Sequence, residues 1–134
     1  MTRQTTTQAE RTAHPDAGVA VLYVCAQRGQ LMPSLAATRA ETEGRAYATA
    51  LGLRITDTIT DPYGEVDPQR RAGWCLVRAL AQAGTIGTVI ARWPAVIAPD
   101  GAADTRHREI QWLQDHGVQV RYSWAPLAAA GDDR

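Results

Sequence analysis

The sequence contains no lysine and no phenylalanine, and its charges cancel. All 14 basic residues are arginines, and 14 acidic residues balance them to a formal net charge of zero. A neutral chain has no overall electric field to attract nucleic acid or an anionic membrane surface. Because the chain is also rich in alanine and glycine, codon bias explains the missing lysine better than arginine chemistry does. The composition indicates GC-rich coding DNA and a bacterial source.

Cysteines and long apolar runs are scarce as well. The only two cysteines, Cys25 and Cys75, both lie in apolar segments and form no C-x-x-C pair. This pattern predicts two small buried thiols in a reducing compartment rather than a disulfide. No apolar run is long enough to cross a bilayer, and residues 1–5 lack the apolar core of a secretion signal. We therefore expect a cytoplasmic protein that has no membrane partner.

Ligand motifs for metals and phosphates are missing too. The three histidines are His14, His107 and His116, and the last two are nine positions apart. On one helix that spacing places them on opposite faces, so they cannot share a metal ion. The segment at Gln27-Arg28-Gly29 lacks the glycines of a phosphate-binding loop. We expect neither a metal nor a cofactor.

The length of 134 residues suits a single domain that can bury its own core without disulfides or metals. Hydrophobic residues make up 45% of the chain and charged residues 21%, which is typical of a globular protein. Residues 1–17 and 126–134 have no apolar periodicity, so we predict a flexible N-terminal arm and a flexible C-terminal tail. The folded domain is predicted to span residues 18–125.

Within that domain, short apolar runs alternate with amphipathic segments. Short runs rich in β-branched residues are typical of buried strands, and spacings of three and four residues are typical of helices. The predicted strands are residues 19–25, 53–59, 86–91 and 118–122, and the predicted helices are residues 33–51, 70–83 and 102–116. The alternation predicts a three-layer α/β fold with a mostly parallel sheet, similar to the flavodoxin-like alternation.

The second predicted helix carries an apolar stripe. Gly73, Leu76, Val77, Leu80 and Gly84 recur at helical spacing, so we expect this face to point toward the core. In open parallel sheets, functional sites lie beyond the carboxyl ends of the strands. We therefore expect a crevice there, lined by Gln27, Arg28, Asp61, Arg71 and Arg92.

The motifs at these strand ends resemble those of the serine recombinases, the resolvases and invertases. That family has a first strand reading Tyr-x-Arg-x-Ser, a helix ending in Tyr-Ala and a glycine, and a strand ending in Asp. An Arg-x-Gly-Leu helix, a third strand running into Leu-Asp-Arg-Leu-x-Arg, and a Gly-Val turn follow. The matching segments, which extend over residues 19–124, are Tyr23 to Gln27, Tyr47-Ala48 with Gly52, Asp61, Arg71 to Trp74, Arg92 to Ala98, and Gly117-Val118.

The resemblance implies a resolvase-like fold, and the departures from it imply lost catalysis. In the family, the serine attacks a DNA phosphate while arginines stabilise the developing charge. Here Gln27 occupies the serine position and Cys25 the first arginine position. The acid and two arginines of the third motif are replaced by Pro94, Ala95 and Ala98, whereas Tyr23, Asp61 and Arg71 match. We expect no recombinase, nuclease or other phosphoryl-transfer activity.

Two side chains leave the nature of the crevice open. Cys25 could replace the nucleophile, but a small hydrophobic role is favoured because no histidine stands near it in the pattern. Trp93, next to Arg92, could be an exposed hot spot for a partner, or it could fill the crevice.

These features favour an inactive module that acts by protein interaction or regulation, through a protein partner or self-association, with a DNA-handling complex as one setting. The alternative is an α/β domain that binds a small anionic ligand or a nucleotide in the crevice. We expect direct DNA binding to be weak or indirect. Arg70, Arg71 and Arg78 form the only local basic cluster on one predicted helix. The resemblance implies a long dimer helix and a DNA-binding domain after the fourth strand, and we expect this chain to lack both.

Overall fold

The computed structural model describes residues 18–124, and the predicted arm and tail lie outside this range. The elements alternate as predicted. The strands are β1 (Val19–Val24), β2 (Arg54–Thr60), β3 (Thr88–Ala91) and β4 (Gln119–Tyr122). The helices are α2 (Leu35–Leu51), α3 (Ala72–Ala83) and α4 (Ala103–Asp115), with 3-10 turns η2 (Pro68–Arg70), η3 (Pro94–Val96) and η4 (Asp100–Ala102).

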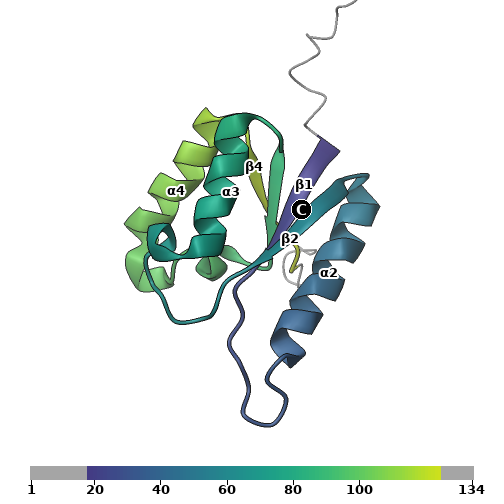
Figure 1. Ribbon diagram of the computed structural model, residues 1–134, viewed down its shortest axis with the longest axis vertical. Helices are drawn as coiled ribbons and strands as arrows, with labels where there is room; N and C mark the ends of the chain where they lie inside the picture. The colour runs from purple at the N-terminus through teal and green to yellow at the C-terminus, as the bar shows by residue number, and fades with distance from the viewer. Residues whose placement is uncertain (1–17, 125–134) are drawn as a thin grey trace, which may run out of the picture.

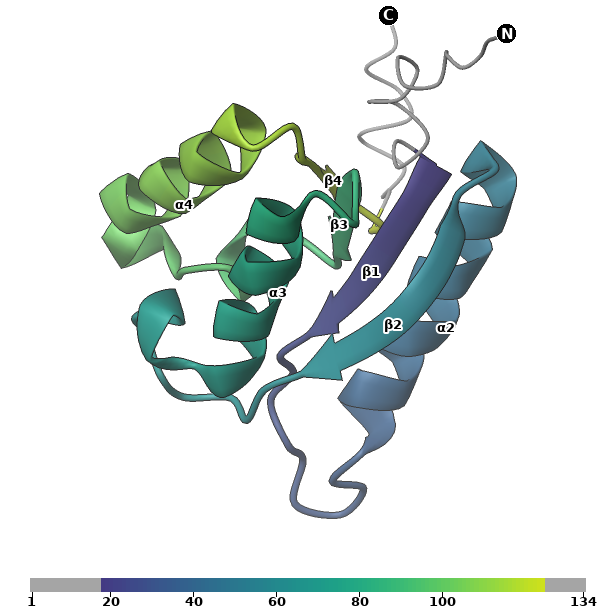
Figure 2. The ribbon, with the colours of Figure 1, turned by 45° about the horizontal axis from the view of Figure 1, so that its top comes forward.

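The four strands form one parallel sheet in the order β2-β1-β3-β4. Helix α2 covers one face of the sheet, and α3 and α4 cover the other (Figure 1 and Figure 2). The predicted three-layer α/β architecture is therefore confirmed. The chain leaves β1 toward β2 on one side and returns to β3 on the other, so the connections diverge between β1 and β3. Such a divergence opens a crevice at the carboxyl ends of the strands.

A hydrophobic core lies on each side of the sheet. On the α3 and α4 side it contains Tyr23, Trp74 and Leu113, and on the α2 side it contains Leu22 and Ile90. All five side chains are almost completely buried. The core therefore holds β1 between two helical layers and fixes the position where its last residues emerge.

The predicted stripe on α3 is wrong at two positions, Leu76 and Gly84, and Gly84 is exposed at the C-cap of the helix. Leu76 is 49% exposed, whereas Trp74 is fully buried and lies in one stripe with Val77 and Ala81. Successive helix positions are about 100° apart, so when Trp74 faces the core, the next two residues, Cys75 and Leu76, face away from it. For the same reason Cys75 is exposed, which contradicts the prediction of two buried thiols. The predicted burial of Cys25 is confirmed.

Candidate functional site

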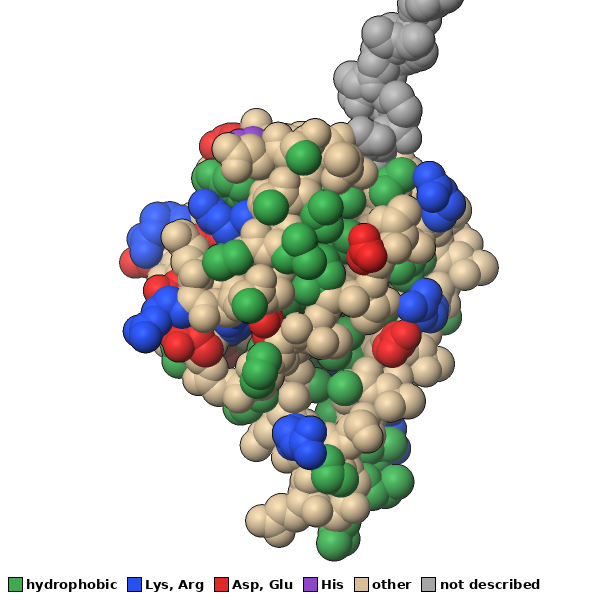
Figure 3. Space-filling model, viewed as in Figure 1, with side chains coloured by type: hydrophobic (Ala, Val, Ile, Leu, Met, Phe, Trp, Pro, Cys, Tyr) green, Lys and Arg blue, Asp and Glu red, His purple; other side chains and the backbone are tan. Residues whose placement is uncertain are grey.

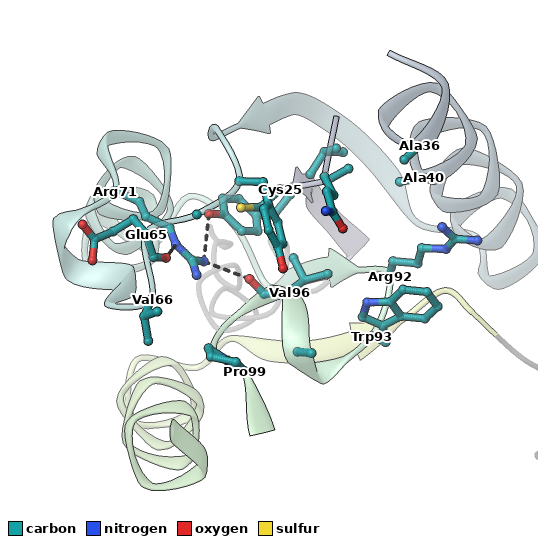
Figure 4. Close-up of a pocket in the computed structure, with 17 residues that line it drawn as sticks. Cys25, Ala36, Ala40, Glu65, Val66, Arg71, Arg92, Trp93, Val96 and Pro99 are labelled. Atoms are coloured by element: carbon teal, nitrogen blue, oxygen red, sulfur yellow. Dashed lines mark hydrogen bonds between the residues drawn. The ribbon is translucent and has the colours of Figure 1, made fainter. Parts of the chain in front are cut away.

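A pocket of about 420 Å³ lies at the carboxyl ends of β1 and β3 (Figure 4). The segments that follow β1, β2 and β3 form its walls, together with the first turns of α2. The structure brings together seven of the residues singled out in the sequence. These lining residues are Tyr23, Cys25, Gln27, Arg71, Arg92, Trp93 and Ala95.

Four other predicted residues do not line this pocket. Arg28 is exposed on the loop that follows β1, and Pro94 is exposed at the start of η3. Ala98 is fully buried, and its carbonyl accepts a hydrogen bond from Arg106 at 2.9 Å. Asp61 borders a shallower neighbouring hollow instead. The expectation that Arg28 and Asp61 line the crevice is wrong, because one side chain lies outside and the other is drawn toward α3.

Asp61 caps the N-terminus of α3. Its carboxylate oxygens accept the backbone N–H of Gly73 at 2.7 Å and of Trp74 at 2.9 Å. A Cβ atom added to Gly73 would lie only 2.7 Å from Asp61 Oδ2, so this close approach requires glycine. A carboxylate at this position satisfies two backbone donors and interacts favourably with the helix dipole. Asp61 therefore sets where α3 begins.

The third partner of Asp61 is Tyr23, whose hydroxyl donates to Oδ2 at 2.6 Å. The same hydroxyl accepts a hydrogen bond from Arg71 Nη1 at 3.3 Å. Burial raises the pKa of Tyr23, and the hydrogen bond to Asp61 raises it further. The phenol therefore stays protonated at neutral pH and cannot serve as a general base.

Arg71 is 6% exposed and forms part of the pocket wall (Figure 4). Its Nε donates to the carbonyl of Glu65 at 2.9 Å, and its Nη1 donates to the carbonyl of Val96 at 2.8 Å. These acceptors are neutral, and no carboxylate among residues 18–124 forms an ion pair with this guanidinium. Arg71 thus joins two pocket loops, and no ion pair with a carboxylate of residues 18–124 compensates its charge.

Arg92 differs because its charge is neutralised. Its Nε lies 3.1 Å from Glu43 Oε1, in a pair that is too poorly aligned for a hydrogen bond. Its Nη2 does donate to the same carboxylate at 3.3 Å. The guanidinium also lies over the ring of Trp93, 4.6 Å from its centroid. The ion pair couples α2 to the segment that follows β3.

Trp93 is 36% exposed and packs edge-on against Trp124, with their ring centroids 5.1 Å apart. It forms a wall of the pocket and leaves the interior open, so the alternative in which Trp93 fills the crevice is wrong. Cys25 lies deeper, with its Sγ 3.6 Å from the carbonyl oxygen of Pro62. Burial raises the pKa of the Cys25 thiol. A raised pKa disfavours the thiolate that nucleophilic chemistry requires.

The β2–α3 loop contributes pocket residues that the sequence analysis missed. Tyr63 and Val66 are 61% and 52% exposed, and both line the pocket together with Glu65. The segment Asp61-Pro62-Tyr63-Gly64 is typical of a turn, but turn-forming residues do not indicate which side chains face the site.

The sequence also gave no sign of a buried acid on α4. Glu109 is 2% exposed and accepts hydrogen bonds from Gln69, Trp74 and Arg78, each at 2.7 Å. Arg78 is thereby neutralised, and its guanidinium stacks 3.9 Å from the ring centroid of Trp112. The predicted basic cluster does not exist as an exposed surface, since Arg71 is buried as well.

No family model and no curated protein matches the sequence, but solved structures do. The C-terminal catalytic domain of ISC1926 TnpA, an IS607-like serine recombinase, superposes with a TM-score of 0.66 and 15% identity. That match covers 85% of this chain and 76% of the other. The chain has the fold of a serine recombinase catalytic domain.

Two further structures share this resolvase-like fold. The N-terminal catalytic domain of TP901-1 integrase gives a TM-score of 0.61 at 14% identity, covering 78% of this chain and 75% of that one. The first ORF in transposon ISC1904 from Sulfolobus solfataricus P2 gives 0.56 at 14% identity, covering 87% and 77%. The resemblance predicted from the ordered motifs is therefore confirmed at the level of the fold.

The resolvase-like domain shows no metal-binding cluster of three or more His, Cys, Asp or Glu within residues 18–124. Over the same range, none of its helices is long and apolar enough to span a membrane.

Proposed function

We propose that this chain is a catalytically inactive resolvase-like domain that acts by binding protein, within a complex that handles DNA. The observation that carries the proposal is the composition of the pocket. Gln27 and Cys25 stand where the resemblance places the nucleophile and an arginine, and Ala95 stands in a motif that otherwise supplies charge. An amide cannot form the covalent phosphoryl intermediate.

The two arginines that line the pocket support the same conclusion. Arg92 is bound to Glu43, and Arg71 uses its Nε and Nη1 to hold two loops together. Phosphoryl transfer needs several cations aimed at one phosphate, and removing such a group costs several kcal/mol of transition-state stabilisation. One remaining cation without a nucleophile does not support that reaction.

The pocket rim supports a role in protein binding. Tyr63, Val66 and Trp93 present apolar surface around the opening, with exposures of 61%, 52% and 36%. Aromatic side chains beside a concave site are enriched among residues that dominate binding energies. The exposed apolar side chains on the rim of the pocket are thus available for contact with a protein partner.

Incubation with supercoiled plasmid, with covalent protein–DNA adducts trapped by denaturation, tests the loss of catalysis. We expect no relaxation, no cleavage and no adduct from the wild-type chain. The variant Gln27→Ser should remain inactive, because the missing cations are not restored. An adduct that forms with the wild-type chain and disappears in Cys25→Ala would overturn the proposal and identify the thiol as the nucleophile.

A second candidate function is the binding of a small anion in the pocket. Arg71 favours it, because a buried cation without a carboxylate partner is costly and an incoming anion would compensate its charge. Thermal-shift titrations with inorganic phosphate, nucleotides and phosphorylated metabolites test this candidate. A true ligand at a hundredfold excess over its dissociation constant stabilises the fold by about 2.7 kcal/mol.

Matched variants assign any such shift to the pocket. Arg71→Lys should reduce the ligand-induced shift, whereas Arg70→Lys, at the exposed neighbouring position, should leave it unchanged. If none of these anions shifts the transition of the wild-type chain, this second function is wrong.

A further inference from the structure

Arg71 brings a positive charge to the pocket that its own contacts do not compensate. The side chain is almost completely buried, and its Nε and Nη1 donate to the carbonyls of Glu65 and Val96 and to the hydroxyl of Tyr23. All three acceptors are neutral, and within residues 18–124 the Nη2 group makes no hydrogen bond. A buried cation without an anionic partner is costly, so the pocket favours a ligand that carries negative charge.

The two other charged side chains of the lining are already compensated. Arg92 is paired with Glu43. The carboxylate of Glu65 accepts a backbone N–H at 3.1 Å and lies 3.9 Å from Arg70. Figure 4 shows this carboxylate pointing away from the other lining side chains, on the far side of Arg71. The pocket therefore has one uncompensated positive charge, which matches a ligand with a single negative charge at one end.

The rest of the pocket is largely apolar. Small apolar side chains from three segments form much of its wall: Ala36, Ala40, Val66, Val96 and Pro99. Tyr63 and Trp93 add exposed aromatic surface at the rim. Figure 3 shows hydrophobic side chains among uncharged surface at the lower end of the domain, where β1 and β2 end. Because burial of apolar surface stabilises a complex, a fitting ligand carries an apolar group close to its negative charge.

We propose that the pocket binds the free C-terminal end of a partner protein, with the terminal carboxylate on Arg71 Nη2 and an apolar last side chain against the alanine and valine wall. At a chain terminus, a carboxylate stands directly beside such a side chain. The exposed rim then contacts the residues that precede the terminus, whereas a free small acid would leave the rim uncovered. Capture of a C-terminal carboxylate is a recurrent mode of peptide recognition. The inference rests on the proposed function, in which the pocket and its rim bind protein.

Fluorescence anisotropy of the full chain with labelled pentapeptides tests the ligand chemistry. The probe ends in leucine with a free carboxylate, and its control has the same sequence with a C-terminal amide. The free acid should bind saturably, and the amide should bind at least about tenfold more weakly, because a hydrogen bond to the buried cation is lost. Equal affinity for acid and amide, or no binding of the acid up to millimolar concentration, would overturn the inference.

Competition with N-acetyl-leucine separates a protein terminus from a small acid. This compound carries the same carboxylate and side chain but has no preceding residues to contact the rim. It should displace the labelled peptide at least about tenfold less effectively than the unlabelled peptide does. Equal competition would identify a small apolar acid as the ligand and overturn the assignment to a protein partner.

Two substitutions of Arg71 separate its charge from its structural contacts. Arg71→Gln and Arg71→Lys both lose the planar fork that joins the two loops, but only lysine keeps the charge. The lysine variant should therefore bind the free acid more tightly than the glutamine variant does. Arg39→Gln is the control, since Arg39 is exposed on α2 and does not line the pocket, and it should bind like the wild-type chain. Equal binding by the two Arg71 variants would show that the charge is not recognised.

A substitution on another wall tests the pocket without altering Arg71. Figure 4 shows Ala36 and Arg71 on opposite sides of the pocket. Ala36→Phe should fill the cavity and weaken peptide binding at least about tenfold, whereas Thr38→Phe, at an exposed position of α2 outside the lining, should leave it unchanged. Circular dichroism should confirm that both variants are folded. An equal effect of the two substitutions would place the peptide outside the pocket.

The other assays keep this inference distinct from the proposed function. Loss of peptide binding leaves the plasmid result standing, whereas a wild-type covalent adduct overturns the proposed function whether or not the peptide binds. A thermal shift with inorganic phosphate that depends on Arg71, in a chain that binds no peptide, would overturn the inference in favour of the small-anion candidate.

Discussion

The hydroxyl of Tyr23 on β1 donates to the carboxylate of Asp61 after β2, with the two oxygens 2.6 Å apart. The same carboxylate caps α3 through Gly73 and Trp74. Two residues that the resemblance assigns to a catalytic site therefore connect two strands to a helix. These contacts give both residues a structural role in the domain.

Replacing Asp61 with alanine should destabilise the fold by about 2–4 kcal/mol, because the helix loses its cap and the Tyr23 hydroxyl loses its acceptor. Asp57→Ala is the matched control, since Asp57 is exposed on β2. Its effect should stay within about 0.5 kcal/mol. Urea denaturation monitored by tryptophan fluorescence measures both values. Similar losses in the two variants would show that the cap contributes little.

Alkaline pH should destabilise the domain through Tyr23. Burial, together with the hydrogen bond to Asp61, raises the pKa of this phenol in the folded state. In the unfolded chain a tyrosine ionises near pH ~10. Above that pH the unfolded state binds fewer protons than the folded state, so the free energy of unfolding falls as pH rises.

Denaturation curves between about pH 8 and 11 measure this dependence. Tyr23→Phe should be less stable at neutral pH but should lose less stability over the alkaline range. Tyr63→Phe, at a position 61% exposed, should keep the wild-type slope. A wild-type slope in Tyr23→Phe would show that another group controls the alkaline transition.

The two cysteines should differ in reactivity toward iodoacetamide. Cys75 is exposed, whereas Cys25 is buried and burial raises the pKa of its thiol. Fewer thiolates and poor access both slow alkylation of Cys25. Mass spectrometry should find Cys75 labelled first in the native protein, and Cys75→Ser should remain almost unlabelled until denaturant is added. Rapid native labelling of Cys25 would contradict the buried environment.

Direct binding to DNA should be weak and sensitive to salt. Arg78 is paired with Glu109, Arg71 is buried, and Arg70 lies 3.9 Å from Glu65. Affinity for duplex DNA depends on exposed cations, and each phosphate contact adds roughly 0.9 to the salt slope. We expect fluorescence anisotropy with random duplex and single-stranded DNA to give dissociation constants above micromolar at physiological salt.

Arg70→Gln provides the variant for that titration. It should lower the salt slope by no more than about one contact. Submicromolar affinity that persists at higher salt would reveal a basic surface outside the residues named above.

The order of elements was predictable from the sequence, because strands and helices follow local periodicity. The apolar run at residues 19–25 and the spacing in residues 102–116 depend on neighbours within a few positions, and backbone geometry converts that spacing into faces. The carboxyl ends of the strands, and thus the location of the pocket, followed from the parallel alternation. Gln27 and Arg92 follow the ends of β1 and β3, and both line the pocket as expected on these grounds. Arg71 lies at the start of α3, and its place at the pocket was expected from the resemblance.

Only the tertiary structure decided what those residues contact. Arg92 donates a hydrogen bond to Glu43, which is 49 positions away in the sequence, and Tyr23 donates one to Asp61, which is 38 positions away. The burial of Glu109, which accepts a hydrogen bond from Trp74, likewise depends on how α3 packs against α4. Such pairings depend on the packing of distant segments, which leaves no periodic pattern in the sequence. Local backbone geometry determines which face of a helix or strand a residue lies on, whereas long-range packing determines which charged or polar side chain it contacts there.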